Sequence, residues 1–155
     1  MHADVLVLGE THLEYLFWES MSEDETNASI VLAGMMGDEV KLKVTKFGPD
    51  RLYLEVRPPM GQGSKDDWFN LRVPQGMRTH FIERARDSDN LDNTERQARM
   101  ASRLANYLRM HPGGKTVLIC GSRHAESVAN HLLQRVKRRP IRVNVDYVRI
   151  PFDGI

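Results

Sequence analysis

The sequence predicts an α/β fold: a mainly parallel sheet flanked by helices, in a single domain over residues 1–155. Two observations support this prediction. An apolar run of strand length ends in glycine near the start of the chain, and a strand–helix–strand succession with short links fills its last third. Strands joined by such a helical crossover run parallel, so the second half is expected to form a βαβ unit.

The composition is that of a soluble globular protein. The chain has 155 residues, with 41% hydrophobic and 28% charged residues, which is enough to bury a core. The formal net charge of +1 offers no electrostatic support for a nucleic-acid partner. Cys120, the only cysteine, excludes an internal disulfide, and no apolar run reaches the length of a membrane span. We therefore expect a cytoplasmic protein without a membrane partner.

The first third of the chain has a clear strand at each end and an ambiguous middle. Residues 4–8 form a β-branched apolar run and are predicted as a buried strand. Apolar spacing favours a helix over 13–21, and the polar, acidic segment 22–27 is predicted as a loop. Between 29 and 47 the pattern fits a strand and a helix equally. Residues 51–56 follow a Gly-Pro-Asp turn and are predicted as a strand.

The second half has stronger signals. A Gly-rich segment over 60–67 is predicted as an exposed loop, either a lid over a site or a plain connector. Thr94-x-x-Gln97 matches a capping box and opens a helix that stops at Pro112-Gly113-Gly114. Three elements are predicted to follow, in order: a strand over 116–120, a helix over 125–136 and a strand over 141–148.

Two Gly-x-x-His sequences follow predicted strands: Gly9-Glu10-Thr11-His12 and Gly121-Ser122-Arg123-His124. In open parallel sheets, functional groups gather where the strands end, and a glycine lets the backbone turn sharply there. On neighbouring strands, the two turns would bring His12, His124 and Glu10 to one crevice. Such a group can bind a divalent metal or perform acid–base catalysis. Either motif alone is more often a histidine that hydrogen-bonds a loop, so it is the pair that favours a functional site.

These motifs resemble the superfamily that joins TraB/GumN proteins, Tiki proteases, ChaN-like haem-uptake proteins and erythromycin esterases. Its members carry an N-terminal strand that ends in Gly-x-x-His, often with Glu second. Three further features are similar to that pattern: Gly48-Pro49-Asp50 before Leu52-Tyr53-Leu54-Glu55, Glu95-Arg96 with Met100, and the second Gly-x-x-His. Arg123 departs from the small residues that usually precede this histidine. Residues 61–93 match no part of the pattern, and the chain is shorter than typical members.

The resemblance implies a hydrolase of an amide or ester bond in a small-molecule or peptide substrate, with a divalent metal as a candidate cofactor. The implied catalytic residues are Glu10, His12 and His124. The implied substrate contacts are Arg96 and Arg123, with Arg96 approaching Glu55. The implied metal ligands are Glu10, His12, Glu55 and His124.

Other interpretations stay open. The ChaN-like branch and the short chain also fit a binding protein that kept the crevice and lost turnover. Arg123-His124-Ala125-Glu126 resembles the Arg-His-Gly-Glu signature of histidine phosphatases, but too few residues follow it to supply that family's other catalytic groups. For a hydrolase, water is the expected nucleophile. Ser122 lacks a Gly-x-Ser-x-Gly elbow, and Cys120 lies in an apolar run.

Overall fold

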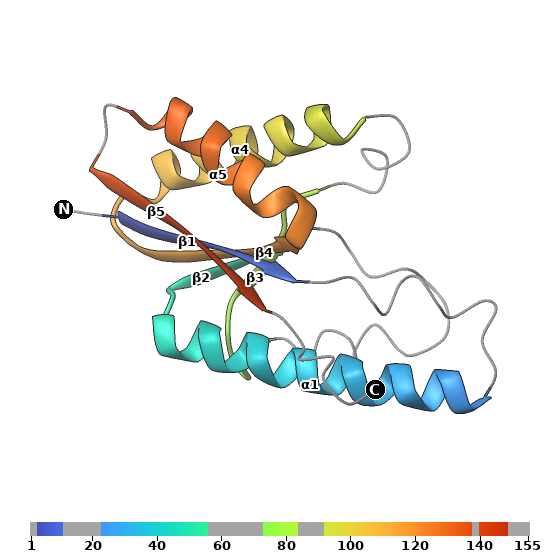
Figure 1. Ribbon diagram of the computed structural model, residues 1–155. Coiled ribbons are helices and arrows are strands. Elements are labelled where there is room, and N and C mark those ends of the chain that lie inside the picture. The colour runs from blue at the N-terminus through green and yellow to red at the C-terminus, as the bar shows by residue number, and fades with distance from the viewer. Residues whose placement is uncertain (1–2, 11–22, 56–72, 84–91, 138–139, 149–155) are drawn as a thin grey trace.

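The computed structural model describes residues 3–10, 23–55, 73–83, 92–137 and 140–148, with the side chains of 23–34 left out of the description. Its elements, labelled as in Figure 1, are β1 (Ala3–Glu10), α1 (Glu23–Phe47), β2 (Arg51–Leu54), β3 (Thr79–Phe81), α4 (Asn93–Met110), β4 (Gly114–Gly121), α5 (Ser122–Arg135) and β5 (Ile141–Val148). None of the helices in this part of the chain is long and apolar enough to cross a membrane.

The five strands form one sheet in the order β3-β2-β4-β1-β5, and every neighbouring pair is parallel. The predicted parallel α/β architecture is therefore confirmed. β1 lies inside the sheet and pairs with β4 on one side and β5 on the other. The two strands that precede the Gly-x-x-His motifs are thus neighbours, with Glu10 in register with Gly121.

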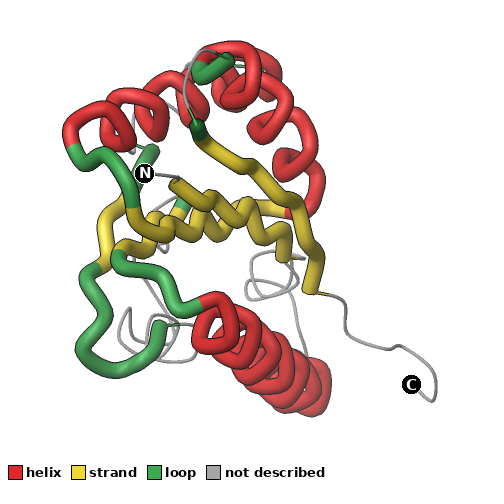
Figure 2. Tube along the Cα trace, turned by 90° about the vertical axis from the view of Figure 1, so that its left-hand side faces the viewer, coloured by secondary structure: helices red, strands yellow, loops and turns green. Residues whose placement is uncertain are grey.

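Helices cover both faces of the sheet (Figures 1 and 2). α4 and α5 pack on one face, and α1 lies across the other. β1 shows the alternation that this layering requires, because Val5 and Val7 belong to the core under α4 and α5, whereas Leu6 and Leu8 belong to the core on the α1 side. A strand covered on both faces has a continuous apolar run, which explains the pattern of residues 4–8.

Three predictions for the first half need comment. The loop predicted over 22–27 is wrong, because α1 begins at Glu23. Acidic residues in a first helical turn complement the helix dipole, so a polar segment there is compatible with a helix start. The ambiguous stretch 29–47 is helical, and its Met36, Val40 and Val44 are fully buried at a spacing of four. The helix predicted over 13–21 lies outside the described residues.

The second half follows the predicted order with shifted boundaries. α4 begins at Asn93, where Asp92 rather than Thr94 is the N-cap and accepts a hydrogen bond from the Glu95 N–H (2.8 Å), so the capping box is wrong. α5 begins three residues before the predicted start, at Ser122. The strand over 141–148 is confirmed residue by residue. β3 was missed because three residues are too few to show a strand pattern.

Candidate functional site

Four buried polar side chains lie where strands of the sheet end. Glu10 is the last residue of β1, Glu55 follows β2, Glu83 lies two residues past β3, and His124 lies three residues past β4. Their exposed fractions are 1%, 4%, 4% and 8%. The carboxyl ends of parallel strands share one edge of the sheet, where such folds place their functional groups. Buried carboxylates at that edge need partners, because an unpaired buried charge is costly.

Arg96 supplies the counter-charge for two of these carboxylates. It stands in the first turn of α4. Its Nε donates to Glu83 Oε1 (2.6 Å) and its Nη2 donates to Glu83 Oε2 (2.9 Å), a bidentate pair. The same Nη2 donates to Glu55 Oε1 (3.1 Å). The guanidinium therefore holds both carboxylates in fixed positions, because charge-assisted bonds of this kind are strong and directional.

The second oxygen of Glu55 is bound by the backbone. The Gly121 N–H donates to Glu55 Oε2 (2.6 Å), at the junction where β4 passes into α5. An N–H at a helix N-terminus has no partner within the helix, and the helix dipole favours a negative charge there. Glu55 thus joins the end of β2 to the start of α5.

His124 faces the same carboxylate from the first turn of α5. Its Nε2 lies 3.6 Å from Glu55 Oε1, and its Nδ1 lies 2.9 Å from the side-chain nitrogen of Gln97 on α4. With the Gln97 amide as donor, Nδ1 is the acceptor and the neutral ring carries its proton on Nε2, toward Glu55. A separation of 3.6 Å is too long for a direct hydrogen bond but suits two groups that contact one shared water molecule.

The structure brings three of the six predicted site residues together: Glu55, Arg96 and His124. The predicted approach of Arg96 to Glu55 is confirmed, while the role of each residue toward a substrate stays a prediction. Glu10 ends the neighbouring strand, but the strand alternation assigns it to the α1 face with Leu8. Arg123 is exposed on α5, and His12 lies outside the described residues.

Among the described residues, no group of three or more His, Cys, Asp or Glu side chains is arranged to hold a metal ion. The hydrogen bonds of Glu55 give one reason. Both of its oxygens accept bonds, from Arg96 and from the Gly121 N–H, and an adjacent guanidinium disfavours a second cation. Glu55 therefore fits the role of a hydrogen-bond acceptor and not that of a metal ligand.

Cys120 is buried beneath this cluster, as predicted, at 1% exposure. Burial raises the pKa of its thiol well above the ordinary value, and the neighbouring charges of Glu55 and Glu10 raise it further. A thiol in this state carries almost no thiolate at neutral pH and is a poor nucleophile.

Sequence reasoning missed two members of the cluster, Glu83 and Gln97. A signal for Glu83 existed, because Phe81-Ile82-Glu83 repeats the pattern of Tyr53-Leu54-Glu55, an apolar pair followed by glutamate. Gln97 was interpreted as part of a capping box and instead reaches His124. Its role depends on the packing of α4 against α5, which no local pattern reports.

Comparisons with protein-family models, with curated proteins and with solved structures find no match to this chain. Fold and site therefore define its class by themselves. The protein is a parallel α/β domain with a buried Glu–Arg–Glu–His cluster at the carboxyl edge of its sheet.

Proposed function

We propose that the protein is a hydrolase of an amide or ester bond, with His124 and Glu55 at the centre of its site. One observation supports this proposal above the others: a buried histidine lies 3.6 Å from a carboxylate whose two oxygens are held in place by Arg96 and the Gly121 N–H. A histidine oriented by fixed partners is the usual means of moving a proton near neutral pH. The resemblance of the paired Gly-x-x-His motifs points to the same chemistry.

The proposed reaction uses water as the nucleophile. A water molecule that accepts a hydrogen bond from His124 Nε2–H and donates one to Glu55 Oε1 attacks the carbonyl carbon of the substrate and gives up a proton to Glu55. The tetrahedral adduct then breaks its bond to the amine or alcohol, which leaves with the proton of His124 Nε2, and the proton on Glu55 returns to the ring. Gln97 holds the imidazole ring in position through Nδ1, so the proton moves at Nε2. Cys120 is not needed, since its raised pKa leaves it protonated.

A divalent metal bound through His12 and His124 stays a proposal that rests on the resemblance; Glu10, which strand alternation assigns to the α1 face, and Glu55, whose two oxygens are already bound, do not fit as its further ligands. Such an ion would lower the pKa of a bound water toward neutrality. Elemental analysis of the purified protein, together with titration of zinc, manganese and cobalt ions into the chelator-treated protein, tests this part separately from turnover.

The decisive experiment measures hydrolysis of p-nitrophenyl esters and fluorogenic peptide amides by the purified chain, with and without added divalent metal. His124→Ala is expected to lower kcat/KM about a hundredfold or more, the range that removal of a general acid costs. His131→Ala is the matched control, because this residue lies on the same helix, two turns on and half-buried. A variant lacking both His12 and His124 that keeps full activity would rule out the mechanism.

A binding protein without turnover is the second candidate, and one observation favours it. Arg96 is bound by two carboxylates, and Glu55 is bound on both oxygens, which is also how a purely structural ion-pair network is built. Retention of a small ligand through purification, with no hydrolysis of any ester or amide, would favour this candidate. Hydrolysis that depends on His124 would exclude it.

A further inference from the structure

The two outer strands of the described sheet, β3 and β5, differ in length (Figures 1 and 2). β3, at one edge, has three residues. β5, at the other edge, has eight residues and contains no glycine, proline or lysine. Short strands, prolines and lysines are the common devices that stop an edge from pairing with another chain. Within the described part of the chain β5 pairs with β1 alone, so its outer side is a long, regular edge.

The direction of the backbone groups on β5 follows from its pairing with β1. The Ala3 N–H donates to the Pro140 carbonyl (3.0 Å). Because alternate residues of a strand direct their N–H and C=O to opposite neighbours, the even-numbered residues of β5 bond β1. The residues whose backbone groups face outward are Ile141, Val143, Val145 and Tyr147. The outward Tyr147 N–H donates to the adjacent Asp146 Oδ1 (2.8 Å), a local partner for an edge donor.

The side chains of β5 are arranged symmetrically about Asn144. An antiparallel pairing of two β5 strands centred on this residue sets Arg142 opposite Asp146 of the second copy, on both sides of the centre. It also sets Val143 opposite Val145, and Ile141 opposite Tyr147. These last four residues are half-buried against the core under α5, so each pairing places apolar beside apolar. Opposite charges that face each other across two strands stabilise the pairing, and like charges oppose it.

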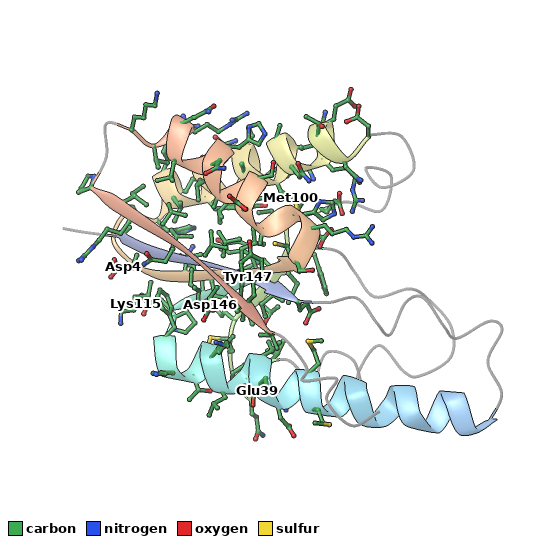
Figure 3. The ribbon with its side chains drawn as sticks, in the orientation of Figure 1. Asp4, Glu39, Met100, Lys115, Asp146 and Tyr147 are labelled. Atoms are coloured by element: carbon green, nitrogen blue, oxygen red, sulfur yellow. The ribbon has the colours of Figure 1, made fainter. Side chains whose placement is uncertain are left out.

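We propose that β5 is a homodimer interface, in which the β5 strands of two copies pair antiparallel about Asn144 and join the two sheets. The outward backbone groups of the odd-numbered residues then form the hydrogen-bonded pairs, and Arg142 and Asp146 form the closer, non-hydrogen-bonded pairs. Both charged side chains can reorient, since they are 70% and 49% exposed. Figure 3 shows Asp146 and Tyr147 on this strand.

Within one chain, these two charges have other partners. Arg142 Nε lies 3.2 Å from Asp4 Oδ1, and Lys43 Nζ lies 2.8 Å from Asp146 Oδ2. This arrangement makes a charge exchange diagnostic. In Arg142→Asp/Asp146→Arg, both pairs within the chain become repulsive, because a carboxylate at position 142 would face Asp4 and a guanidinium at position 146 would face Lys43. Both pairs between the copies, in contrast, are restored with the opposite polarity.

The test is sedimentation equilibrium of the full chain. The wild-type protein is expected to dimerise with a dissociation constant below about 0.1 mM, since interfaces of standard size reach about micromolar constants or tighter ones. Each single exchange, Arg142→Asp or Asp146→Arg, should raise the dimer dissociation constant about tenfold, and the double exchange should restore it. A double exchange that dimerises more weakly than either single variant would overturn the proposal. So would a wild-type protein that is monomeric at about 0.1 mM, which would leave the edge to a strand of another protein.

A proline variant tests the backbone part of the proposal. Val145→Pro removes one outward N–H and leaves the bonds to β1 intact, a placement that edge strands tolerate. It should abolish the dimer while the circular dichroism spectrum stays that of the folded chain. Val145→Thr keeps the N–H and the β-branched shape and should dimerise as the wild type does. A dimer that survives Val145→Pro uses another surface, and the proposal then fails.

Discussion

Replacement of Arg96 by methionine tests whether the buried cluster depends on the guanidinium that binds Glu55 and Glu83. Glu83 and Glu55, with side chains 2% and 5% exposed, would both lose the guanidinium that binds them, and the site is too buried for bulk water to replace it. Removal of one partner from a buried ion pair costs about 3–5 kcal/mol. We expect the free energy of unfolding of Arg96→Met to fall by about that amount, a large part of the roughly 5–15 kcal/mol that stabilises a domain.

The assay is equilibrium urea unfolding followed by far-ultraviolet circular dichroism, with equal m-values required before free energies are compared. Arg99→Met is the matched control, one helical turn along on the exposed side of α4, and it should change the free energy by less than about 0.5 kcal/mol. In Glu83→Gln/Arg96→Met the loss should be smaller than the sum of the two single losses, by about 1–3 kcal/mol, because the removed groups are partners. An Arg96→Met protein as stable as Arg99→Met would refute the reasoning.

Three further predictions follow from single contacts. Gly9→Ala should lower the unfolding free energy by about 1–3 kcal/mol in thermal melts, because its Cβ would lie 3.0 Å from the Ser122 Cα atom; an unchanged melting temperature would show that α5 can shift. Cys120 should react with a thiol reagent only after unfolding, since burial raises the pKa of its thiol, and rapid labelling of the native protein would contradict this. The hydrogen bond from Lys43 lowers the pKa of Asp146, so the ionised carboxylate stabilises the folded protein at neutral pH. At so exposed a site this contribution is below about 1 kcal/mol, and it is lost as the pH falls through the pKa range of carboxyl groups. Carbon-detected NMR titration of Lys43→Met should therefore find the pKa of Asp146 returned toward its ordinary value, and an unchanged pKa would assign the shift to another cause.

Local patterns in the sequence were enough to predict the parallel α/β class and the bounds of β5. A buried parallel strand needs a continuous apolar run and a crossover needs a short helix, and both are properties of adjacent residues. The Gly-x-x-His pattern identified His124, whereas Glu55 and Arg96 were predicted from the family resemblance. Local patterns failed at the beginning of α1, where the polar residues of a first helical turn resemble a loop.

Apart from the approach of Arg96 to Glu55, which the resemblance implied, tertiary structure alone decided which of these side chains meet. Arg96 reaches Glu55 across 41 residues of sequence and His124 meets Gln97 across 27, and both contacts depend on how α4 packs over the sheet and against α5. Glu83 became part of the cluster because β3 pairs with β2, a register that three residues cannot specify locally. Glu10, grouped with these residues by sequence, belongs to the opposite face by strand alternation. Contacts between distant segments follow from the packing of whole elements, whereas periodicity reports only the face that each element buries.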